Sequence, residues 1–287
     1  MTAAREPVYL VVNADDFAYF PGVSQGIIQA HRNGLVTATG VLANGTSFEE
    51  DVPALVAEGG LDAGVHLNLT HGPPLTEGIR RRLPGAGDSF AGKAWFVRSC
   101  LSRRIRVPDI AGEWRAQIER CLAHGLTIRF LNSHEHVHIL PSLLELIQTL
   151  AADYGIPYTR FPDARIAVGG TTGDLIRCAV LHGFAVWNRR RLVVPAPRFL
   201  GAEHSGRLTQ SRLTDILTTL EPGRVYELMC HPGSGTGTEG AESSVRAYHG
   251  WEAELASLTS DETRSLCESN MIRLVGYRDL DGLAVAP

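Results

Sequence analysis

Ionisable side chains that can bind a metal ion stand in four short stretches of the chain. Asp15 and Asp16 are adjacent carboxylates, and histidines stand at His66, within 134–138 and at His231. Adjacent carboxylates repel each other unless a cation neutralises one of them or a proton resides there. Two imidazoles and one carboxylate, with further positions open to water, form a coordination set that is typical of catalytic zinc and workable for other divalent ions. The residue types therefore indicate a catalytic metal site, whereas the carboxylate pair alone could equally cap a turn or a helix.

Each stretch lies in or beside a predicted strand, near its carboxyl end. Apolar strings bounded by Gly, Asn or Pro are typical of buried strands in a mostly parallel sheet. They occur at 8–12, 36–43, 64–69, 127–131, 156–161, 224–230 and 271–276. Helical patterns alternate with these strings, at 22–33, 48–58, 110–124, 141–154, 209–220 and 251–269. Because α/β folds place active sites at the carboxyl ends of their strands, we expect the four stretches to meet in one site.

The alternation of strands and helices predicts right-handed βα units in one α/β domain over residues 1–287. Both a closed barrel and an open doubly wound sheet fit this order. We expect a (β/α) barrel, which need not be regular. Segments 75–107 and 162–204 are rich in Gly, Pro and Arg. We interpret them as insertions above the sheet rather than as linkers between domains.

The overall composition is that of a globular protein that acts on a small molecule. Hydrophobic residues make up 44% and charged residues 20%, which excludes disorder, and no apolar run is long enough to span a membrane. The net charge of −4 gives no electrostatic footprint for nucleic acid. The apolar run at 8–12 is too short for a signal peptide, so we expect a cytoplasmic protein. The sequence leaves homo-oligomer formation open.

Two alternative functions use the same residues. His134, Glu135 and His138 match the H-E-x-x-H pattern of zinc metalloproteases, which requires a helix. Pro141 follows closely and a strand pattern precedes, so a helix is disfavoured there. A non-catalytic sugar-binding protein could also use these clusters. Asp15 distinguishes it from a hydrolase, because a binding protein needs no free carboxylate beside a metal.

The motifs resemble those of the YdjC-like carbohydrate deacetylases, which include bacterial chito-oligosaccharide deacetylases. The matching stretches are Asn-Ala-Asp-Asp-Phe at 13–17, Gly-Val-His-Leu-Asn-Leu-Thr at 64–70, Ser-His-Glu-His-Val-His at 133–138 and Met-Cys-His-Pro at 229–232. Their order and spacing agree from about residue 8 to about residue 235. One departure is visible, because Ala18 stands where the family usually has Gly.

The resemblance implies that Asp16, His66 and His134 bind one divalent metal ion, Mg²⁺ or Zn²⁺. By a further likeness to NodB-type polysaccharide deacetylases, it implies that Asp15 is the general base. We therefore expect a metal-dependent hydrolase that removes an acetyl group from an N-acetylated sugar or oligosaccharide. In this reaction, Asp15 accepts a proton from water and His231 protonates the departing amine.

Five further residues are predicted to contact the substrate or to support the metal ligands. They are His136, His138, Arg160, Asn68 and Trp95. Arg160 ends a predicted strand and could orient Asp15 by an ion pair, and a surface charge is an equally open alternative. Trp95, in the first insertion, could stack on a sugar ring, although aromatic residues more often lie in the core. Either histidine could support a ligand, or be satisfied in the core.

Overall fold

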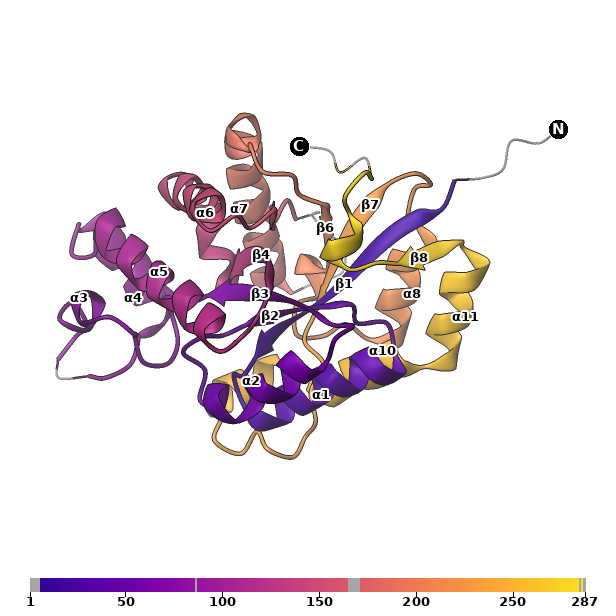
Figure 1. The fold of residues 1–287 in the computed structure, drawn as a ribbon, viewed down its shortest axis with the longest axis horizontal. Coiled ribbons are helices and arrows are strands. Elements are labelled where there is room, and N and C mark those ends of the chain that lie inside the picture. The colour runs from indigo at the N-terminus through magenta and orange to yellow at the C-terminus, as the bar shows by residue number, and fades with distance from the viewer. Residues whose placement is uncertain (1–5, 86, 165–170, 284, 286–287) are drawn as a thin grey trace.

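Eight parallel strands form one curled sheet in the computed structural model, which describes residues 6–85, 87–164, 171–283 and 285 (Figure 1). The order along the sheet is β5-β4-β3-β2-β1-β7-β6, and β8 pairs with the start of β1. The strands are β1 (Val8–Phe17), β2 (Ala38–Val41), β3 (Asp62–Leu67), β4 (Ile128–Ser133), β5 (Tyr158–Thr159), β6 (Arg198–Leu200), β7 (Val225–Cys230) and β8 (Ile272–Leu274). The predicted α/β class and the alternation of elements are confirmed.

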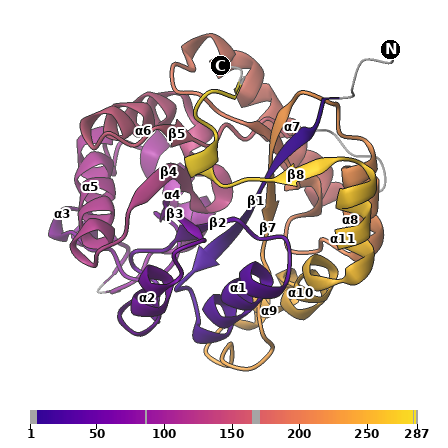
Figure 2. The ribbon, with the colours of Figure 1, turned by 45° about the vertical axis from the view of Figure 1, so that its right-hand side comes forward.

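Helices surround the curled sheet (Figure 2). They are α1 (Pro21–Asn33), α2 (Phe48–Ala57), α4 (Gly92–Leu101), α5 (Val107–Ala123), α6 (Pro141–Asp153), α7 (Thr172–Asn188), α8 (Gln210–Thr218), α10 (Trp251–Thr259) and α11 (Asp261–Ser269), with the shorter α3 (Glu77–Arg80) and α9 (Ser243–Tyr248). Pro141 begins α6, as the helical pattern at 141–154 predicts. Gly155, which lies beyond the end of this helix, has a left-handed φ of 64°. No helix among the described residues is long and apolar enough to cross a membrane.

The sheet is an incomplete barrel. Within the described residues, no backbone pairing joins β5 to β6, the two ends of the strand order. Arg160, which follows β5, is fully buried and lies over the ring of Phe199 on β6, with its guanidinium carbon 5.0 Å from the ring centroid. Side-chain packing therefore occupies the seam that hydrogen bonds would close in a regular barrel. The irregular barrel predicted from the sequence is confirmed in this half-barrel form.

The two segments interpreted as insertions differ in what they contribute. Segment 75–107 carries α3 and α4, while segment 162–204 carries α7 and β6. Residues 86 and 165–170, which belong to these segments, lie outside the described residues. Because β6 pairs with β7, the second segment supplies a strand of the sheet in addition to structure above it.

The helix predicted over 251–269 is two helices. Ser260 has an extended backbone, with ψ of 144°, and its hydroxyl accepts a hydrogen bond from the backbone N–H of Thr263 at 3.1 Å. This N-cap starts α11 in a new direction. The break leaves α10 free to pack beside α1 near the end of β7 (Figure 2).

Candidate metal centre

Both adjacent carboxylates face one cavity because β1 carries a bulge near its carboxyl end. In a regular strand, successive side chains point to opposite faces. The pairing of β1 with β2 shifts register between Ala14 and Phe17, and Asp16 has a left-handed backbone with φ of 72°. Asp15 and Asp16 therefore both line the cavity, inside β1 rather than after it. Ala18 is also left-handed, with φ of 70°, so its side chain adds strain of about 1–2 kcal/mol that a Gly would not have.

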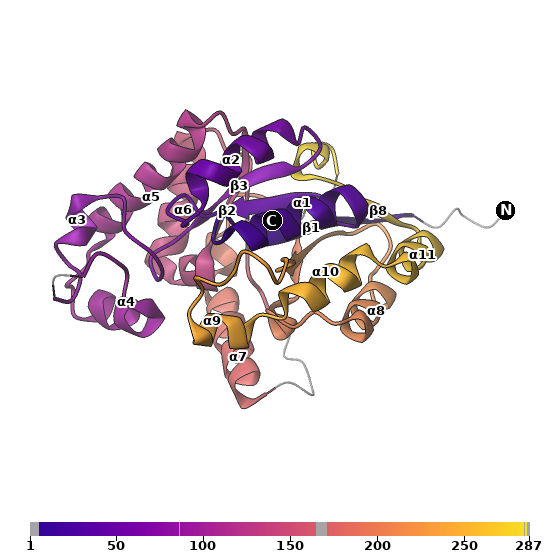
Figure 3. The ribbon, with the colours of Figure 1, turned by 90° about the horizontal axis from the view of Figure 1, so that it is seen from below.

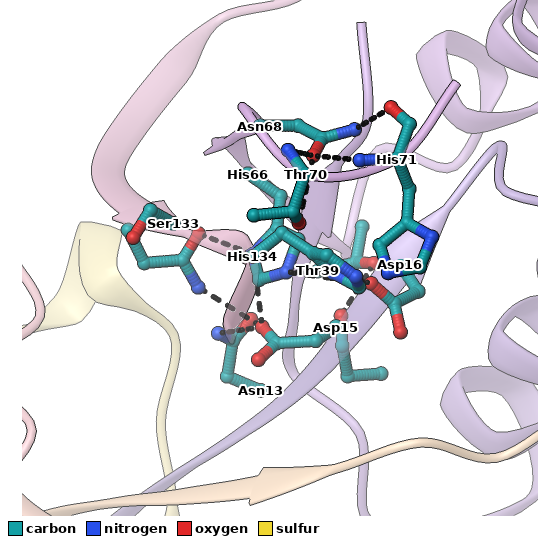
Figure 4. Close-up of polar contacts among 12 residues, drawn as sticks. Asn13, Asp15, Asp16, Thr39, His66, Asn68, Thr70, His71, Ser133 and His134 are labelled. Carbon is teal, nitrogen blue, oxygen red and sulfur yellow. Dashed lines mark hydrogen bonds and ion pairs between the residues drawn. The ribbon is translucent and has the colours of Figure 1, made fainter. Parts of the chain in front are cut away.

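Three candidate ligand atoms converge at the carboxyl ends of β1, β3 and β4 (Figure 4). Asp16 Oδ1 lies 2.9 Å from His134 Nδ1 and 3.3 Å from His66 Nε2, and the two ring nitrogens are 3.3 Å apart. All three side chains are buried and could hold one metal ion. Burial raises the pKa of Asp16, but the adjacent His134 and His66 together outweigh this effect and hold the pKa well below its usual value. The site therefore offers a carboxylate that is ionised at neutral pH, as a metal ligand must be.

Asn132 connects the imidazole of His66 to the carboxylate of Asp15. Its Oδ1 lies 2.7 Å from His66 Nδ1, and its Nδ2 donates to Asp15 Oδ1 at 2.9 Å. If Nδ1 carries the proton, the lone pair of Nε2 faces the other two ligand atoms. Gly40 on β2 makes room for this network, because a Cβ there would lie 3.2 Å from Asn132 Oδ1 and 3.3 Å from Asp15 Oδ1.

Arg160 orients Asp15, as the sequence predicted, and it also pairs with a second buried carboxylate. Its Nη1 donates to Asp15 Oδ2 at 2.6 Å, and its Nε donates to Glu227 Oε1 at 2.7 Å. The Asn13 amide bonds to both carboxylates at 3.2 Å. Burial raises the pKa of Asp15, but the Arg160 guanidinium, with smaller contributions from His66 and His231, more than compensates and lowers the pKa below its usual value. Asp15 is thus an ionised carboxylate that is held in one orientation.

The segment that contains the H-E-x-x-H pattern is not an α-helix. Residues His134–Ile139 form a 3₁₀ segment whose second and third residues have left-handed φ values of 54° and 56°. His138 is fully buried, and its two ring nitrogens lie 2.6 Å from the Ser133 hydroxyl and 3.0 Å from the backbone carbonyl of Arg160. His138 therefore supports the backbone of the site and cannot share a metal with His134. The metalloprotease alternative is wrong.

A cavity of about 310 Å³ opens over the three candidate ligands. Helices α4, α7 and α9 lie on the same side of the molecule and contribute to its wall (Figure 3). Its lining residues are Asp15, Asp16, Tyr19, His66, His71, Lys93, His134, Glu135, His136, Arg177, Ser205, Met229, His231, Ser244, Val245, Tyr248 and His249. His231 is buried, and its Nδ1 has no hydrogen-bond partner among the described residues. The cavity is at the lower end of the range for small-ligand sites.

Of the three remaining predicted residues, His136, Asn68 and Trp95, only His136 lines the cavity. His136 lines the cavity, and burial followed by the charge of Arg160 lowers its pKa well below the usual value, so its ring is neutral. Asn68 is not among the lining residues, because its side chain bonds to Asn44 and to the backbone of 70–71. Trp95 packs against the core, and Lys93 of the same helix lines the cavity instead. The predictions of substrate contact by Asn68 and Trp95 are therefore not supported by their positions.

Comparison with known proteins agrees with this arrangement. A family model described as YdjC-like protein matches residues 9–269. The chain belongs to the YdjC-like family. A carbohydrate deacetylase of Brevibacillus brevis is 30% identical over 274 residues, which cover 94% of this chain and 99% of the relative. A human carbohydrate deacetylase is also 30% identical, over 97% of this chain and 93% of the relative.

A solved structure supports the fold of this YdjC-like chain. The crystal structure of a putative cellobiose-phosphate cleavage protein from Enterococcus faecalis has 25% sequence identity and a TM-score of 0.71. The match covers 96% of this chain and 99% of that one. The curled parallel sheet is therefore shared along almost the whole length of both proteins.

Several residues of this YdjC-like site were not predicted from the sequence. Glu227 had a visible signal, since it is the one acidic residue in the apolar string 224–230 and such a charge is rarely buried without a partner. Asn132 follows the string 127–131 directly, at the end of a strand. Lys93 and His249 lie in segments where the sequence shows no comparable pattern. Their place in the cavity follows from the fold alone.

Proposed function

We propose that this protein is a metal-dependent carbohydrate deacetylase that hydrolyses the acetamide of an N-acetylated sugar or oligosaccharide. The observation that carries the proposal is the convergence of Asp16 Oδ1, His66 Nε2 and His134 Nδ1 within 3.3 Å, beside the ionised Asp15. The names of the relatives, which include a chitooligosaccharide deacetylase of Escherichia fergusonii, supply the substrate class.

The three converging residues fit a divalent metal ion, and the flanking residues fit acid-base chemistry. An ion such as Mg²⁺ or Zn²⁺, held by Asp16, His66 and His134, would polarise the acetyl carbonyl and lower the pKa of water in the site. Asp15, whose orientation Arg160 fixes, accepts a proton from the attacking water. His231 gives a proton to the departing amine, and its side chain lines the cavity in which the substrate would bind.

The whole chain serves this reaction as one catalytic domain in our proposal, and segments 75–107 and 162–204 help to select the saccharide. Lys93 and Arg177, one from each segment, line the cavity and support this role. A cytoplasmic location and homo-oligomer formation stay predictions from the sequence. A sugar-binding protein without turnover is disfavoured, because the chain buries the charged groups of Arg160 and Glu227 to orient Asp15, which binding alone does not need.

The test combines elemental analysis of the purified protein with acetate release from N-acetylglucosamine and from N-acetylated chito-oligosaccharides. We expect about one divalent ion per chain, and acetate release that stops when the metal is chelated. His66→Gln should lose both the metal and the activity. The half-exposed His124, which bonds to Glu49 on the surface, provides the matched His124→Gln control that keeps both. If metal is bound but no sugar releases acetate, the deacetylase proposal is contradicted, while the assignment of the metal site is still supported.

A further inference from the structure

The backbone of His231 is held by one buried carboxylate. Glu254 on α10 is 1% exposed, and its Oε2 accepts the N–H of His231 at 2.6 Å. Its Oε1 accepts the N–H of Leu208 at 3.1 Å. Leu208 belongs to the chain that runs from β6 past Ser205, which lines the cavity. One side chain therefore connects the segment after β7 to another wall of the cavity.

The first turn of α10 also contacts the segment after β7, at Gly233. Gly233 donates its N–H to the carbonyl of Trp251 at 3.2 Å, and a Cβ at Gly233 would lie 3.0 Å from the Trp251 side chain. The Trp251 ring stacks on His249 at 5.2 Å and 3°, and His249 lies 5.1 Å from the ring of His231. The turn thus contacts the backbone two residues after His231 directly, and it contacts the His231 ring through His249.

These contacts explain how a histidine without a side-chain partner keeps its place. Asp15 is oriented by direct bonds from Arg160, whereas no described residue bonds Nδ1 of His231. Its ring position must then come from its backbone and from packing. We propose that Glu254 is a positioning residue for His231, and that it fixes the proton donor by accepting two backbone N–H groups from two cavity walls.

This inference rests on the proposed role of His231, and a double-mutant cycle tests it. Glu254→Gln replaces one acceptor oxygen with an NH₂ group, which cannot accept a backbone N–H. We expect acetate release from N,N′-diacetylchitobiose to fall about 10- to 100-fold in kcat with little change in KM, since a displacement of about 1 Å can cost 10²-fold. In a His231→Ala background, the same substitution should cost less than about 2-fold, because the group it positions is absent. An equal cost in both backgrounds would overturn the proposal.

A second measurement does not depend on activity. The ring ¹H–¹³C NMR signals of His231, assigned with His231→Ala, should shift or broaden in Glu254→Gln. Thr263→Val is the control, because Thr263 is also fully buried and bonds to Gln210 and Ser257 at 2.9 Å, away from the cavity. It should lower the melting temperature and leave both the His231 signals and kcat unchanged. Unchanged His231 signals in Glu254→Gln would overturn the proposal even if no sugar were deacetylated, whereas absent acetate with shifted signals would count against the proposed function alone.

Discussion

The inner end of the cavity and its rim are held in place by different interactions. At the inner end, Asp15 bonds to Arg160 and Asn132, and all three side chains are buried. At the rim, Lys93 pairs with Glu135 at 3.0 Å, but the Lys93 side chain is 45% exposed. Charged hydrogen bonds are strong when buried and weak when solvated. The inner end is therefore fixed before substrate arrives, while the rim can adjust to different saccharides.

The largest effect on kcat should follow substitution of Asp15, the carboxylate at the inner end that is not a proposed metal ligand. Asp15→Asn keeps the shape of the side chain and removes the base, so we expect kcat for acetate release to fall about 10²- to 10⁴-fold with the metal content unchanged. Glu135→Gln at the rim is the matched control and should stay within about 3-fold, since its ion-pair partner Lys93 is 45% exposed. A greater loss in Glu135→Gln than in Asp15→Asn would reverse the comparison between inner end and rim.

Arg160 should matter most for stability. Arg160→Leu leaves Asp15 and Glu227 buried without their cation, and breaking a buried pair in this way costs about 3–5 kcal/mol in the free energy of unfolding. Chemical denaturation with a chelator present measures this cost without a metal contribution. Arg115→Leu removes an ion pair to Asp153 whose two side chains are both 42% exposed, so it should cost less than about 1 kcal/mol. Similar costs for the two variants would show that the inner network is not preorganised.

The stability lost in Arg160→Leu should depend on pH in a definite direction. In the wild type, the pKa of Asp15 is lowered by Arg160 against the effect of burial, so its contribution to stability is present at neutral pH and is lost as the pH falls through the folded-state pKa. Without Arg160, burial raises that pKa, and protonation then relieves an unpaired charge. The stability difference between wild type and Arg160→Leu should therefore narrow below about pH 5. A difference that widens on acidification would contradict this account.

Asn132 should affect metal affinity more than folding. Asn132→Ala removes the group that fixes the His66 ring, and loss of such a partner usually weakens metal binding about 10- to 100-fold. Competition with a chelator of known affinity measures the change. Asn270→Ala, which removes a bond to a helix carbonyl far from the site, should leave the metal affinity unchanged. Equal affinities in both variants would mean that packing alone orients His66.

The sequence indicated which residues lie at the ends of the strands, but not how their side chains are oriented and held. Asp16, His66 and His134 were recognisable because polar residues at the ends of apolar strings have few other reasons to be there. The bulge that turns Asp16 toward its partners depends on a left-handed φ, which residue types alone do not reveal. Glu254 lies on the buried side of a helix, and its bonds to two distant backbone N–H groups exist only once the fold brings them together.

The same reasoning explains why the fold class was predictable and the seam was not. Strand and helix periodicity is local, so alternating elements can be recognised one at a time. Closure between β5 and β6 depends on how Arg160 and Phe199 fill the gap, which is a property of distant side chains. The segment 162–204 looked like an insertion because the three residues of β6 are too few to form a visible apolar string.

The smallest effect should come from the rim. Tyr248 lines the cavity, and its hydroxyl accepts a hydrogen bond from Arg177 Nη1 at 3.0 Å. Tyr248→Phe removes the hydrogen bond that holds Arg177 at the cavity wall. We expect this wall to bind the substrate equally before and during the reaction, so KM should rise about 2- to 10-fold with kcat unchanged, as for one lost hydrogen bond. Tyr226→Phe removes a buried hydroxyl that accepts the backbone N–H of Glu221, which precedes β7, and it should change neither constant. A fall in kcat for Tyr248→Phe would instead show that α9 helps to align the reacting groups, and the rim would then belong with the inner end.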